Sequence, residues 1–595
     1  MGNNYGISLG PGSYRHRVDE MIKLLEEDKF VERLWNKERE LWIKGVGKEK
    51  DDVLLGWLDV IPEMQRELSS IEDFVREVKE EGFTQAVVLG MGGSSLAPLV
   101  FNCTFPFSDK GLKLTVLDST DPATIADVES KLDLKSTLFI VSSKSGSTTE
   151  VNAFFNYFYY KVARVKHEKT GDNFAAITDE GSPLAVLAKD KKFRKLFLNF
   201  PEIGGRFSAL SYFGLVPAAL MGVSIKEILD RALIASEACR NRIISDNPGV
   251  LLGVILGELA LEGKNKLTYS LPQELSSFGL WMEQLLAEST GKEGVGILPV
   301  KFDETDAHAP GSDRFFVNLE LKPAALSLQK DLDNSFISHP LIKLGMDDLM
   351  DLGQQFFIWE IATATAGYIL ELNPFDQPDV QSSKKCTSDL LNKIKAEGEQ
   401  DALRPLVVEG PLSFYTKDYS IGIAESLLAC FLSPAGFGNY LAILAYLPEE
   451  GSVTEGLIQV QDKLKNCFAL PVTCEFGPRY LHSTGQLHKG GPEGGIFLQF
   501  ISETVNDIHI PGEDYTFGTL IKAQAVGDMQ ALQDKGRRVM LVNLGEDVKE
   551  GLLLFNDLLR KVTEQYHRAA LRGQNLNSPG LSVGAAMQRK ASGWI

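Results

Sequence analysis

Short apolar segments rich in strand-forming residues recur in the first part of the chain, with helix-length segments between them. The segment at residues 150–165 is one such helix-length stretch. Strands that alternate with helices form a parallel sheet covered by helices on both faces, and ligands of such folds bind beyond the carboxyl ends of the strands. The sequence therefore predicts a doubly wound α/β unit, with strands at residues 86–89, 114–117, 138–141 and 175–178.

The alternation continues along the rest of the chain. The N-terminal residues instead carry apolar side chains at helical spacing, which indicates amphipathic helices that pack on a later sheet. Residues 273–287 predict a helix, and residues 381–404 predict a polar helix followed by a linker. Later strands are expected at 266–270, 315–319, 366–372, 440–447, 496–501 and 539–544. We therefore expect an N-terminal helical segment at 1–60, a first unit at 61–216, a second at 217–395 and a third, C-terminal α/β unit at 396–595.

The composition is that of a folded, acidic chain. Of its 595 residues, 44% are hydrophobic and 24% are charged, which is typical of globular proteins. At about 150 residues per domain, the length allows three or four units. The formal net charge of −19 excludes nucleic acid and anionic lipid as partners of the whole surface, so that an anionic ligand needs a local site.

Three further observations favour a cytoplasmic protein without a membrane anchor. The six cysteines show no CxxC spacing, which fits free thiols in a reducing compartment. The N-terminal residues contain no apolar leader, and Gly6 stands where a myristoylation signal has Ser or Thr. The apolar stretch that starts at Tyr440 has eight residues, well short of the ~20 that cross a bilayer.

Two strands of the first unit run directly into turns that suit a phosphate group. The first turn lies in VVLGMGGSSL at residues 87–96, where glycines allow close approach and the next helix offers free N–H groups. The second lies in FIVSSKSGSTTE at residues 139–150, where hydroxyls, Lys144 and a helix start can surround a phosphate. The first motif alone fits a plain tight turn equally well, and the hydroxyls of the second are also common helix caps. Neither has the GxGxxG spacing of a dinucleotide fold.

Three other motifs contain candidate catalytic side chains. In EQLLAESTGK, Gln284 and Glu288 share a helix face, although a solvated surface glutamate is the simpler interpretation of that segment alone. In IGGRFS, Arg206 is either a fixed cation able to stabilise an oxyanion or an ordinary surface arginine. In YLHSTGQLHKGG, the spacing of His482 and His488 is poor for a metal site, and a histidine in a loop is more often structural than catalytic.

Together these motifs resemble those of the glucose-6-phosphate isomerases, which have paired sugar-isomerase (SIS) domains. The chain looks most like the isomerase part of the bifunctional transaldolase/glucose-6-phosphate isomerase type. An aldolase barrel needs about 250 residues, for which there is no room before Gly90, so we expect the isomerase alone. The resemblance implies two doubly wound parallel-sheet SIS domains plus the third unit. It rests on six motifs, GMGGSS, SSKSGSTTE, GGRFS, EQLLAESTGK, NPFDQPDVQSSK and YLHSTGQLHKGG.

The resemblance also implies roles for single residues. Glu288 matches the base that moves a proton between C2 and C1, and Arg206 matches the cation beside the cis-enediolate. His482 matches the histidine that opens the sugar ring, and Lys384 matches the lysine implicated in the same step. The residues implied for substrate binding are Gly93, Ser94, Ser143, Lys144, Ser145, Thr148, Gln284 and Gln377.

The order of these residues differs from the commonest family pattern, in which the histidine precedes the lysine. Here Lys384 precedes His482, and the histidine motif lies in the expected third unit. His308 is the alternative histidine by position, but its surroundings lack the motif. Lys385 and Lys522 are alternatives to the lysine. Exchange of elements in a homo-oligomer would instead place His482 in the site of a neighbouring subunit.

The expected function is the reversible isomerisation of glucose 6-phosphate and fructose 6-phosphate by ring opening and a cis-enediolate. The expected ligand is a small sugar phosphate, and proton transfers of this kind need no metal or redox cofactor. Two alternatives stay open. One is a sugar-phosphate-binding regulator that lost the chemistry, and the other is an isomerase of a related hexose phosphate, such as mannose 6-phosphate. A regulator would lack the base or the acid, whereas this chain carries candidates for both.

Overall fold

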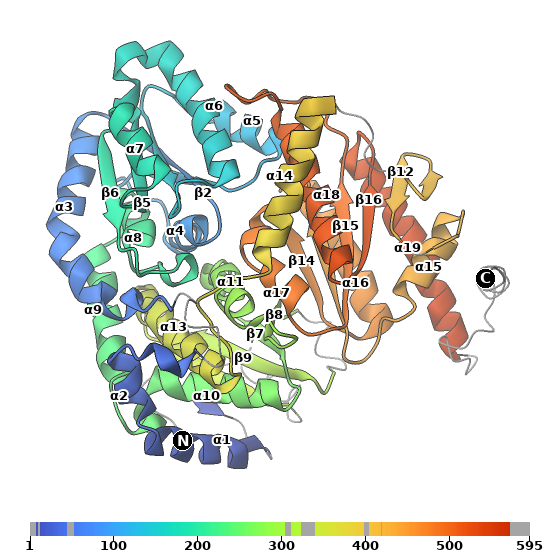
Figure 1. Ribbon diagram of the computed structural model, residues 1–595, viewed down its shortest axis with the longest axis horizontal. Coiled ribbons are helices and arrows are strands. Elements are labelled where there is room, and N and C mark those ends of the chain that lie inside the picture. The colour runs from blue at the N-terminus through green and yellow to red at the C-terminus, as the bar shows by residue number, and fades with distance from the viewer. Residues whose placement is uncertain are drawn as a thin grey trace.

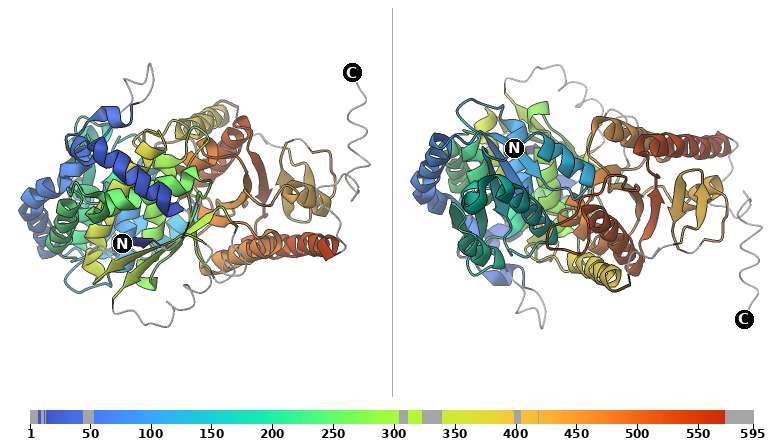
Figure 2. Two further views of the ribbon diagram at one scale, coloured as in Figure 1. Left: turned by 90° about the horizontal axis from the view of Figure 1, so that it is seen from below. Right: turned by 90° about the horizontal axis from the view of Figure 1, so that it is seen from above.

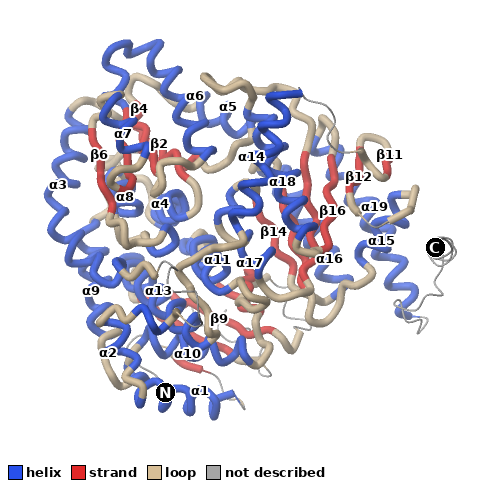
Figure 3. Tube along the Cα trace, in the orientation of Figure 1, coloured by secondary structure: helices blue, strands red, loops and turns tan. Residues whose placement is uncertain are grey.

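The protein is described by a computed structural model that contains three separate β-sheets, each flanked by helices (Figures 1 and 3). The N-terminal helices lie at one end of the molecule, and α19 (Val548–Leu571) lies at the other (Figure 2). Among the described residues, no helix is long and apolar enough to span a membrane. The structure describes residues 7–9, 12, 14–43, 53–303, 311–322, 339–397, 404–417 and 419–571.

The first sheet is entirely parallel, with the strand order β3-β2-β4-β5-β6. Alternate side chains of its central strands enter two different cores, with Val88 and Ile140 on one face and Val87 and Phe139 on the other. This confirms the expected doubly wound unit and adds β6, which the sequence pattern did not reveal. The strands are β2 (Gln85–Gly90), β3 (Lys113–Leu117), β4 (Thr137–Ser142), β5 (Phe174–Asp179) and β6 (Lys195–Asn199).

Helices cover both faces of this first sheet. The helices α3 (Val60–Glu80), α4 (Gly93–Thr104) and α8 (Tyr212–Leu220) pack in the core that contains Val88. The core that contains Val87 is completed by α5 (Pro122–Ser130), α6 (Thr149–Lys166) and α7 (Pro183–Asp190).

The second sheet has the order β1-β10-β9-β7-β8 and is parallel except at its edge. The edge strand β1 belongs to the N-terminal segment, so that this segment contributes a strand as well as the expected helices. The indole nitrogen of Trp42 also donates to the carbonyl of Ala364 at 2.9 Å, which ties the segment to the second unit. The strands are β1 (Ser8–Leu9), β7 (Lys266–Ser270), β8 (Leu298–Lys301), β9 (Arg314–Leu321) and β10 (Leu341–Met346).

Four helices accompany the second sheet, and one of them corrects a prediction. The strand expected at residues 366–372 is wrong, because these residues end the helix α13 (Leu352–Ile369) and form the following turn. Nearly every residue of α13 is buried, so its sequence has no polar face and lacks helical periodicity. The helix expected at 273–287 is a single 3₁₀ turn followed by α11. The remaining helices are α9 (Ile225–Ala238), α10 (Pro248–Leu261) and α11 (Phe278–Thr290).

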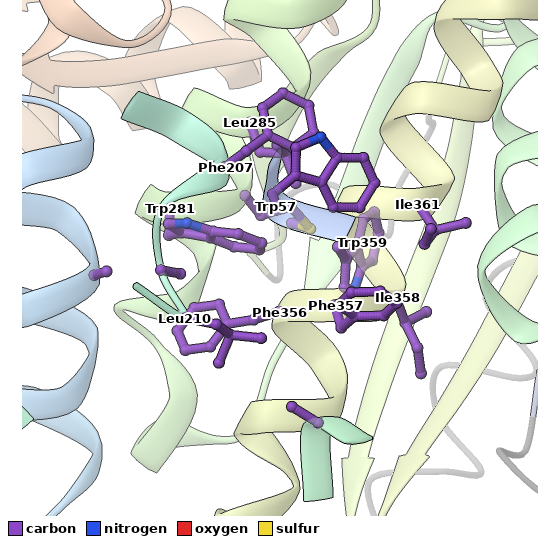
Figure 4. Packing of buried hydrophobic residues seen from close by; sticks show 14 of the residues in the cluster. Trp57, Phe207, Leu210, Trp281, Leu285, Phe356, Phe357, Ile358, Trp359 and Ile361 are labelled. Atoms are coloured by element: carbon purple, nitrogen blue, oxygen red, sulfur yellow. The ribbon is translucent and has the colours of Figure 1, made fainter. Parts of the chain in front are cut away.

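Aromatic side chains hold α11 and α13 together beneath the site described below (Figure 4). Trp281 meets Phe356 edge-on, with ring centroids 4.7 Å apart and planes at 77°. Trp57 stacks on Phe207, with ring centroids 5.2 Å apart. Because Phe207 directly follows Arg206, this stacking fixes the short segment that carries the arginine.

The third sheet is mixed, with the order β11-β12-β16-β15-β13-β14. Its central strands are parallel, and β11 and β12 add an antiparallel edge. One face packs on α15 (Ala424–Leu432), α16 (Gly451–Phe468) and α19, and the other packs on α17 (Gly485–Gly490), α18 (Phe517–Asp534) and residues of α11 and β8. The strands are β11 (Val407–Glu409), β12 (Leu412–Tyr415), β13 (Tyr440–Ala445), β14 (Val472–Phe476), β15 (Gly495–Ile501) and β16 (Arg538–Asn543).

The helix α14 (Val380–Glu397) lies along α18 of the third sheet (Figures 1 and 3). A Cβ atom added to Gly527 of α18 would lie 2.8 Å from the backbone nitrogen of Thr387, which shows how closely the two helices approach. The helix falls in the range 217–395 that we expect for the second unit. We propose that it belongs with the third, because that is the part of the chain it packs against.

Candidate active site

The two candidate phosphate loops lie side by side at the carboxyl edge of the first sheet. They follow the neighbouring parallel strands β2 and β4, whose last residues Gly90 and Ser142 are paired in the ladder. The Ser142 hydroxyl donates to the backbone carbonyl of Ser94 at 3.3 Å, which joins one loop to the start of α4. A Cβ on Gly93 would lie 2.0 Å from the carbonyl oxygen of Gly205, so that this glycine also allows the Arg206 segment to approach.

The second loop presents hydroxyl groups ahead of α6 without closing the end of that helix. Thr148 is the N-cap residue, but its side chain does not cap; its hydroxyl lies 2.9 Å from that of Ser143. The amide of Gly146 donates to the Ser143 hydroxyl at 3.1 Å, and Ser145 is exposed. The Thr148 hydroxyl therefore caps none of the N–H groups of the first turn, which suits an anion at this helix end.

Lys144 differs from its neighbours in the same loop. Its Nζ donates to Asp179 Oδ2 at 2.5 Å and to the backbone carbonyl of Pro201 at 2.8 Å. Asp179 ends β5, the next strand of the sheet. The ammonium group of Lys144 is thus bound to a carboxylate in this structure, and it reaches a phosphate only by leaving or sharing that partner.

The helix α11 places Gln284 and Glu288 on one buried face, as their spacing predicts. The amide nitrogen of Gln284 lies 3.1 Å from Glu288 Oε2 and 2.7 Å from the backbone carbonyl of His482. Glu288 is 8% exposed and Gln284 is 3% exposed, so neither is a solvated surface residue. Gly291 follows the last residue of the helix, also as expected.

Arg206 is held in one orientation by acceptors around its guanidinium. Its Nε donates to Ser289 Oγ at 2.8 Å, and its Nη1 donates to Gln377 Oε1 at 3.0 Å. Its Nη2 donates to two backbone carbonyls of residues 374–376, and Nη1 lies 3.5 Å from Glu288 Oε1. Burial lowers the pKa of Arg206, and the carboxylates nearby offset part of that shift. The result is a rigid cation beside a buried carboxylate.

Lys292 binds the same segment, residues 373–377, that Arg206 contacts. It belongs to the EQLLAESTGK motif, but we did not predict a role for it. Its Nζ donates to the carbonyl of Asn373 at 2.8 Å and to both the carbonyl and Oδ1 of Asp376 at 2.6 Å. Burial, reinforced by the charge of Arg206, lowers the pKa of Lys292 to about 8. Arg206 and Lys292 together fix the segment that carries Gln377.

His482 reaches this site from the third sheet, through the short 3₁₀ helix η9 (Arg479–His482). Its Nε2 lies 3.1 Å from Oε1 of Glu150, in the first turn of α6, and the Gln524 amide donates to the same oxygen at 2.7 Å. Burial opposes ionisation of Glu150, but the charge and hydrogen bond of His482 and the charge of Lys384 outweigh it. The pKa of Glu150 therefore lies below its usual value.

The segment that carries His482 is anchored to the first sheet by an ion pair. Both Nε and Nη2 of Arg479 donate to the carboxylate of Asp118, at 2.8 and 2.9 Å, and Nη2 also meets Glu449 at 2.8 Å. Asp118 directly follows β3, the strand beside β2. This bidentate contact places the histidine over the carboxyl edge of the first sheet.

Comparison with known proteins identifies the family. The family model described as phosphoglucose isomerase matches residues 42–303. The glucose-6-phosphate isomerase of Carboxydothermus hydrogenoformans is 30% identical over 409 residues, which cover 58% of this chain and 86% of that protein. The chain belongs to the phosphoglucose isomerase family. A probable glucose-6-phosphate isomerase of Methanococcus maripaludis is 26% identical over 385 residues, covering 58% of this chain and 86% of the relative.

A solved structure supports the fold. The crystal structure of a glucose-6-phosphate isomerase from Chlamydia trachomatis matches with a TM-score of 0.52 at 20% identity, covering 64% of this chain and 86% of that one. This chain therefore shares the α/β fold of a known phosphoglucose isomerase, with parallel sheets as expected. The family model ends at residue 303, so that His482 and α18 lie outside the matched range.

The three candidate lysines all lie on exposed parts of helices. Lys384 lies on an exposed part of α14, and its charge acts on the buried carboxylate of Glu150. The charge of Lys385 instead acts on the thiol of Cys386, and Lys522 is an exposed residue of α18. The alternative histidine, His308, lies outside the described residues.

Glu150, like Lys292, is a residue of the site that sequence reasoning missed. It stands in the SSKSGSTTE motif, where an acidic residue in the first turn of a helix is favoured by the helix dipole alone. No local signal distinguishes such a glutamate from one that faces a histidine far along the chain. His488, the second histidine of its motif, is buried between Tyr440 and Glu475, away from this carboxylate. Among the described residues, no group of three or more His, Cys, Asp or Glu is arranged to hold a metal ion.

Proposed function

We propose that this protein interconverts glucose 6-phosphate and fructose 6-phosphate, the reaction named in its relatives. One observation carries the proposal: the buried carboxylate of Glu288 lies 3.5 Å from the fixed guanidinium of Arg206, next to the first phosphate loop. A base and a cation at this separation can remove a proton beside a carbonyl and stabilise the charge that forms.

The phosphate group is proposed to bind between the two loops. The hydroxyls of Ser143, Ser145 and Thr148, the turn at Gly93 and Ser94 and the start of α6 supply donors there. We keep Lys144 in this set, but with a smaller share of the affinity than its charge suggests, because its ammonium group is bound to Asp179. Binding energy from the phosphate would orient the reacting carbons, which lie far from it.

Ring opening is assigned to His482 and Lys384. In this step the ring oxygen gains a proton and the hydroxyl on C1 loses one, so an acid and a base are both required. Glu150 orients the imidazole of His482 through the contact of Oε1 with Nε2 at 3.1 Å. The charge of Lys384 acts on the same carboxylate. The two groups therefore approach the sugar from the side of the third sheet.

Proton transfer between the carbons is assigned to Glu288. It takes the proton from C2 of the open aldose and returns it to C1, while Arg206 stabilises the charge of the cis-enediolate between the two steps. Gln284 holds Glu288 Oε2 at 3.1 Å, and Gln377 holds the guanidinium at 3.0 Å. Both amides thus position the reacting groups as well as lining the site.

The alternatives are weaker on this geometry. A sugar-phosphate-binding regulator needs the phosphate loops alone, and the close arrangement of Glu288, Arg206 and Gln284 would then serve no purpose. Isomerisation of mannose 6-phosphate would use the same loops and base. Competition between mannose 6-phosphate and glucose 6-phosphate must therefore decide which of them is the substrate. We also propose a cytoplasmic location, which the six unpaired cysteines support.

The test is a coupled assay in which fructose 6-phosphate is converted and the product is oxidised by an excess of a dehydrogenase specific for glucose 6-phosphate. The Glu288→Gln variant should lose at least about 10²-fold in kcat, because a general base contributes about 10² to 10⁴ in rate. Its stabilisation by fructose 6-phosphate in thermal melting should remain.

Glu283→Gln is the matched control, since it makes the same change on the same helix at a carboxylate bound to Tyr269 rather than to Arg206. Wild-type protein that binds fructose 6-phosphate without turnover would support the regulator and refute the enzyme. A Glu288→Gln variant within tenfold of wild type, on the scale of a general-base effect of about 10² or more, would remove Glu288 from the mechanism.

A further inference from the structure

Asp528 is a fully buried carboxylate of α18 that no step of the proposed mechanism uses. Its exposed fraction is 0%, and four side chains from four different elements converge on it. Oδ1 accepts from Ser383 at 3.1 Å and pairs with Lys489 at 2.6 Å. Oδ2 accepts from Tyr480 at 2.7 Å and from Gln499 at 2.9 Å.

Two of these partners stand next to the ring-opening residues. Ser383 directly precedes Lys384 on α14, and Tyr480 precedes His482 by two residues in η9. A third partner, Lys489, lies on α17, the helix formed by the second half of the histidine motif. One carboxylate thus contacts the segment of each proposed ring-opening group, and the helix beyond one of them.

The bonds to Asp528 are well suited to fix these segments. Hydrogen bonds to an ionised carboxylate are shorter and stronger than neutral ones, and a buried carboxylate without partners is strongly disfavoured. The carboxylate therefore holds its donors in place, because each donor that left would lose a charge-assisted hydrogen bond. Gln499 on β15 ties the group to the centre of the third sheet.

We propose that Asp528 is a positioning residue that aligns Lys384 and His482 for ring opening, and that proton transfer by Glu288 does not depend on it. This inference rests on the proposed function. Asp528 itself touches neither the phosphate loops nor Arg206, so its removal should affect one step of the reaction rather than all of them. It also gives the third sheet, which lies outside the matched family region, a part in catalysis.

The inference is tested by measuring two properties separately. Exchange between the α and β anomers of glucose 6-phosphate, followed by NMR, requires ring opening but no proton transfer by Glu288. Affinity for arabinonate 5-phosphate, an open-chain acid that resembles the enediolate, requires the phosphate loops and Arg206 but no ring opening. A merely structural role of Asp528 would lower both properties together.

Ser383→Ala and Tyr480→Phe each remove one hydrogen bond to Asp528 and leave the Asp528–Lys489 pair intact. Tyr480→Phe also removes the contacts of this hydroxyl with Tyr446 and Gln499. Each should slow enzyme-catalysed anomer exchange by about tenfold or more, since small misplacements of reacting groups have large effects, while affinity for arabinonate 5-phosphate stays within about threefold. Tyr157→Phe is the matched control, because it also removes a bond from a tyrosine to a carboxylate, that of Glu129 on α5. Unchanged exchange in both variants, or a parallel loss of exchange and affinity, would overturn the inference.

A second pair of variants separates positioning from charge compensation. Asp528→Asn leaves Lys489 buried without its partner and should lower the melting temperature. The double variant Asp528→Asn/Lys489→Met removes both charges and should regain much of that melting temperature while anomer exchange stays slow. If the double variant regains both the melting temperature and the rate of anomer exchange, Asp528 only neutralises Lys489 and the inference is wrong. Wild-type protein that neither isomerises fructose 6-phosphate nor accelerates anomer exchange would refute the proposed function as well.

Discussion

His482 Nε2 lies 3.1 Å from Glu150 Oε1, although the two residues are 332 positions apart. The histidine comes from the third sheet and the glutamate from the first turn of α6 on the first sheet. Gln524 donates to the same glutamate oxygen and accepts from Thr120, so the contact is part of a buried network between the two sheets. The proposed acid of ring opening is therefore oriented by a residue of the phosphate loop.

Replacing Glu150 by glutamine should lower turnover without abolishing substrate binding. The variant keeps the shape of the side chain but loses the negative charge that faces the imidazole of His482. We expect kcat in the coupled assay to fall by about 10- to 10²-fold, the range of an impaired acid–base group. Glu129→Gln on α5 is the control, since that carboxylate contacts Tyr157 and Lys161 rather than the histidine. Equal activities of the two variants would contradict a role for the Glu150–His482 contact.

Replacing Gly93 by alanine should displace Arg206. The added Cβ would lie 2.0 Å from the oxygen and 2.3 Å from the carbon of the Gly205 carbonyl, and backbone atoms cannot move aside as a side chain does. Such overpacking costs about 1 to 3 kcal/mol of stability, and a shift of about 1 Å in Arg206 should lower kcat by roughly 10²-fold.

Gly451→Ala provides the comparison for that substitution. Gly451 begins α16, and an added Cβ would meet nothing within 4 Å. We expect melting temperature and activity close to those of wild type. Loss of activity in both variants, or in neither, would show that the close approach of Gly93 to Gly205 is not what places the arginine.

Glu283 should make the protein less stable as the pH rises. Burial, reinforced by the Glu475 carboxylate, raises the pKa of Glu283 from 4.5 to about 8. The folded state therefore retains a proton that the unfolded chain loses above pH 4.5, and the associated stability is present below 4.5 and lost as the pH rises toward 8. Glu283→Gln carries no such charge.

The measurement is urea unfolding of the wild-type protein and the Glu283→Gln variant between pH 4.5 and about pH 8. The free energy of unfolding of the variant, relative to wild type, should increase by roughly 2 to 4 kcal/mol between the lower and the upper end of the window. A difference that does not change with pH would contradict the burial of an ionisable Glu283.

Activity should not depend on association between subunits. Glu288, Arg206 and His482 come from one chain, and Gln284 bonds both Glu288 and the His482 carbonyl. Specific activity should therefore stay constant when the protein is diluted through the range in which light scattering shows any oligomer to dissociate. A loss of specific activity that follows dissociation would mean that a neighbouring subunit completes the site.

Much of the fold could be predicted from the sequence because its signals are local. The strands of the first sheet show apolar runs bounded by turns, and the loops after β2 and β4 carry glycine and hydroxyl residues within a few positions. The helix α13 escaped prediction because it is buried on all sides, so that no polar face marks its period. The short strands β6, β8 and β14 also lack a distinctive pattern and are defined by their ladder partners.

The sequence by itself determined which side chains could do the chemistry: two anion-binding turns, Glu288 on a helix face and Arg206 in a glycine-rich segment. Spacing and turn chemistry act over a few residues, so these groups are visible without a structure. Only the tertiary structure decided that Lys144 is bound to Asp179, that Glu150 faces His482, and that Asp528 joins the segments of Lys384 and His482. Those partners are set by the packing of three sheets, and a contact between residues hundreds of positions apart leaves no local pattern in the chain.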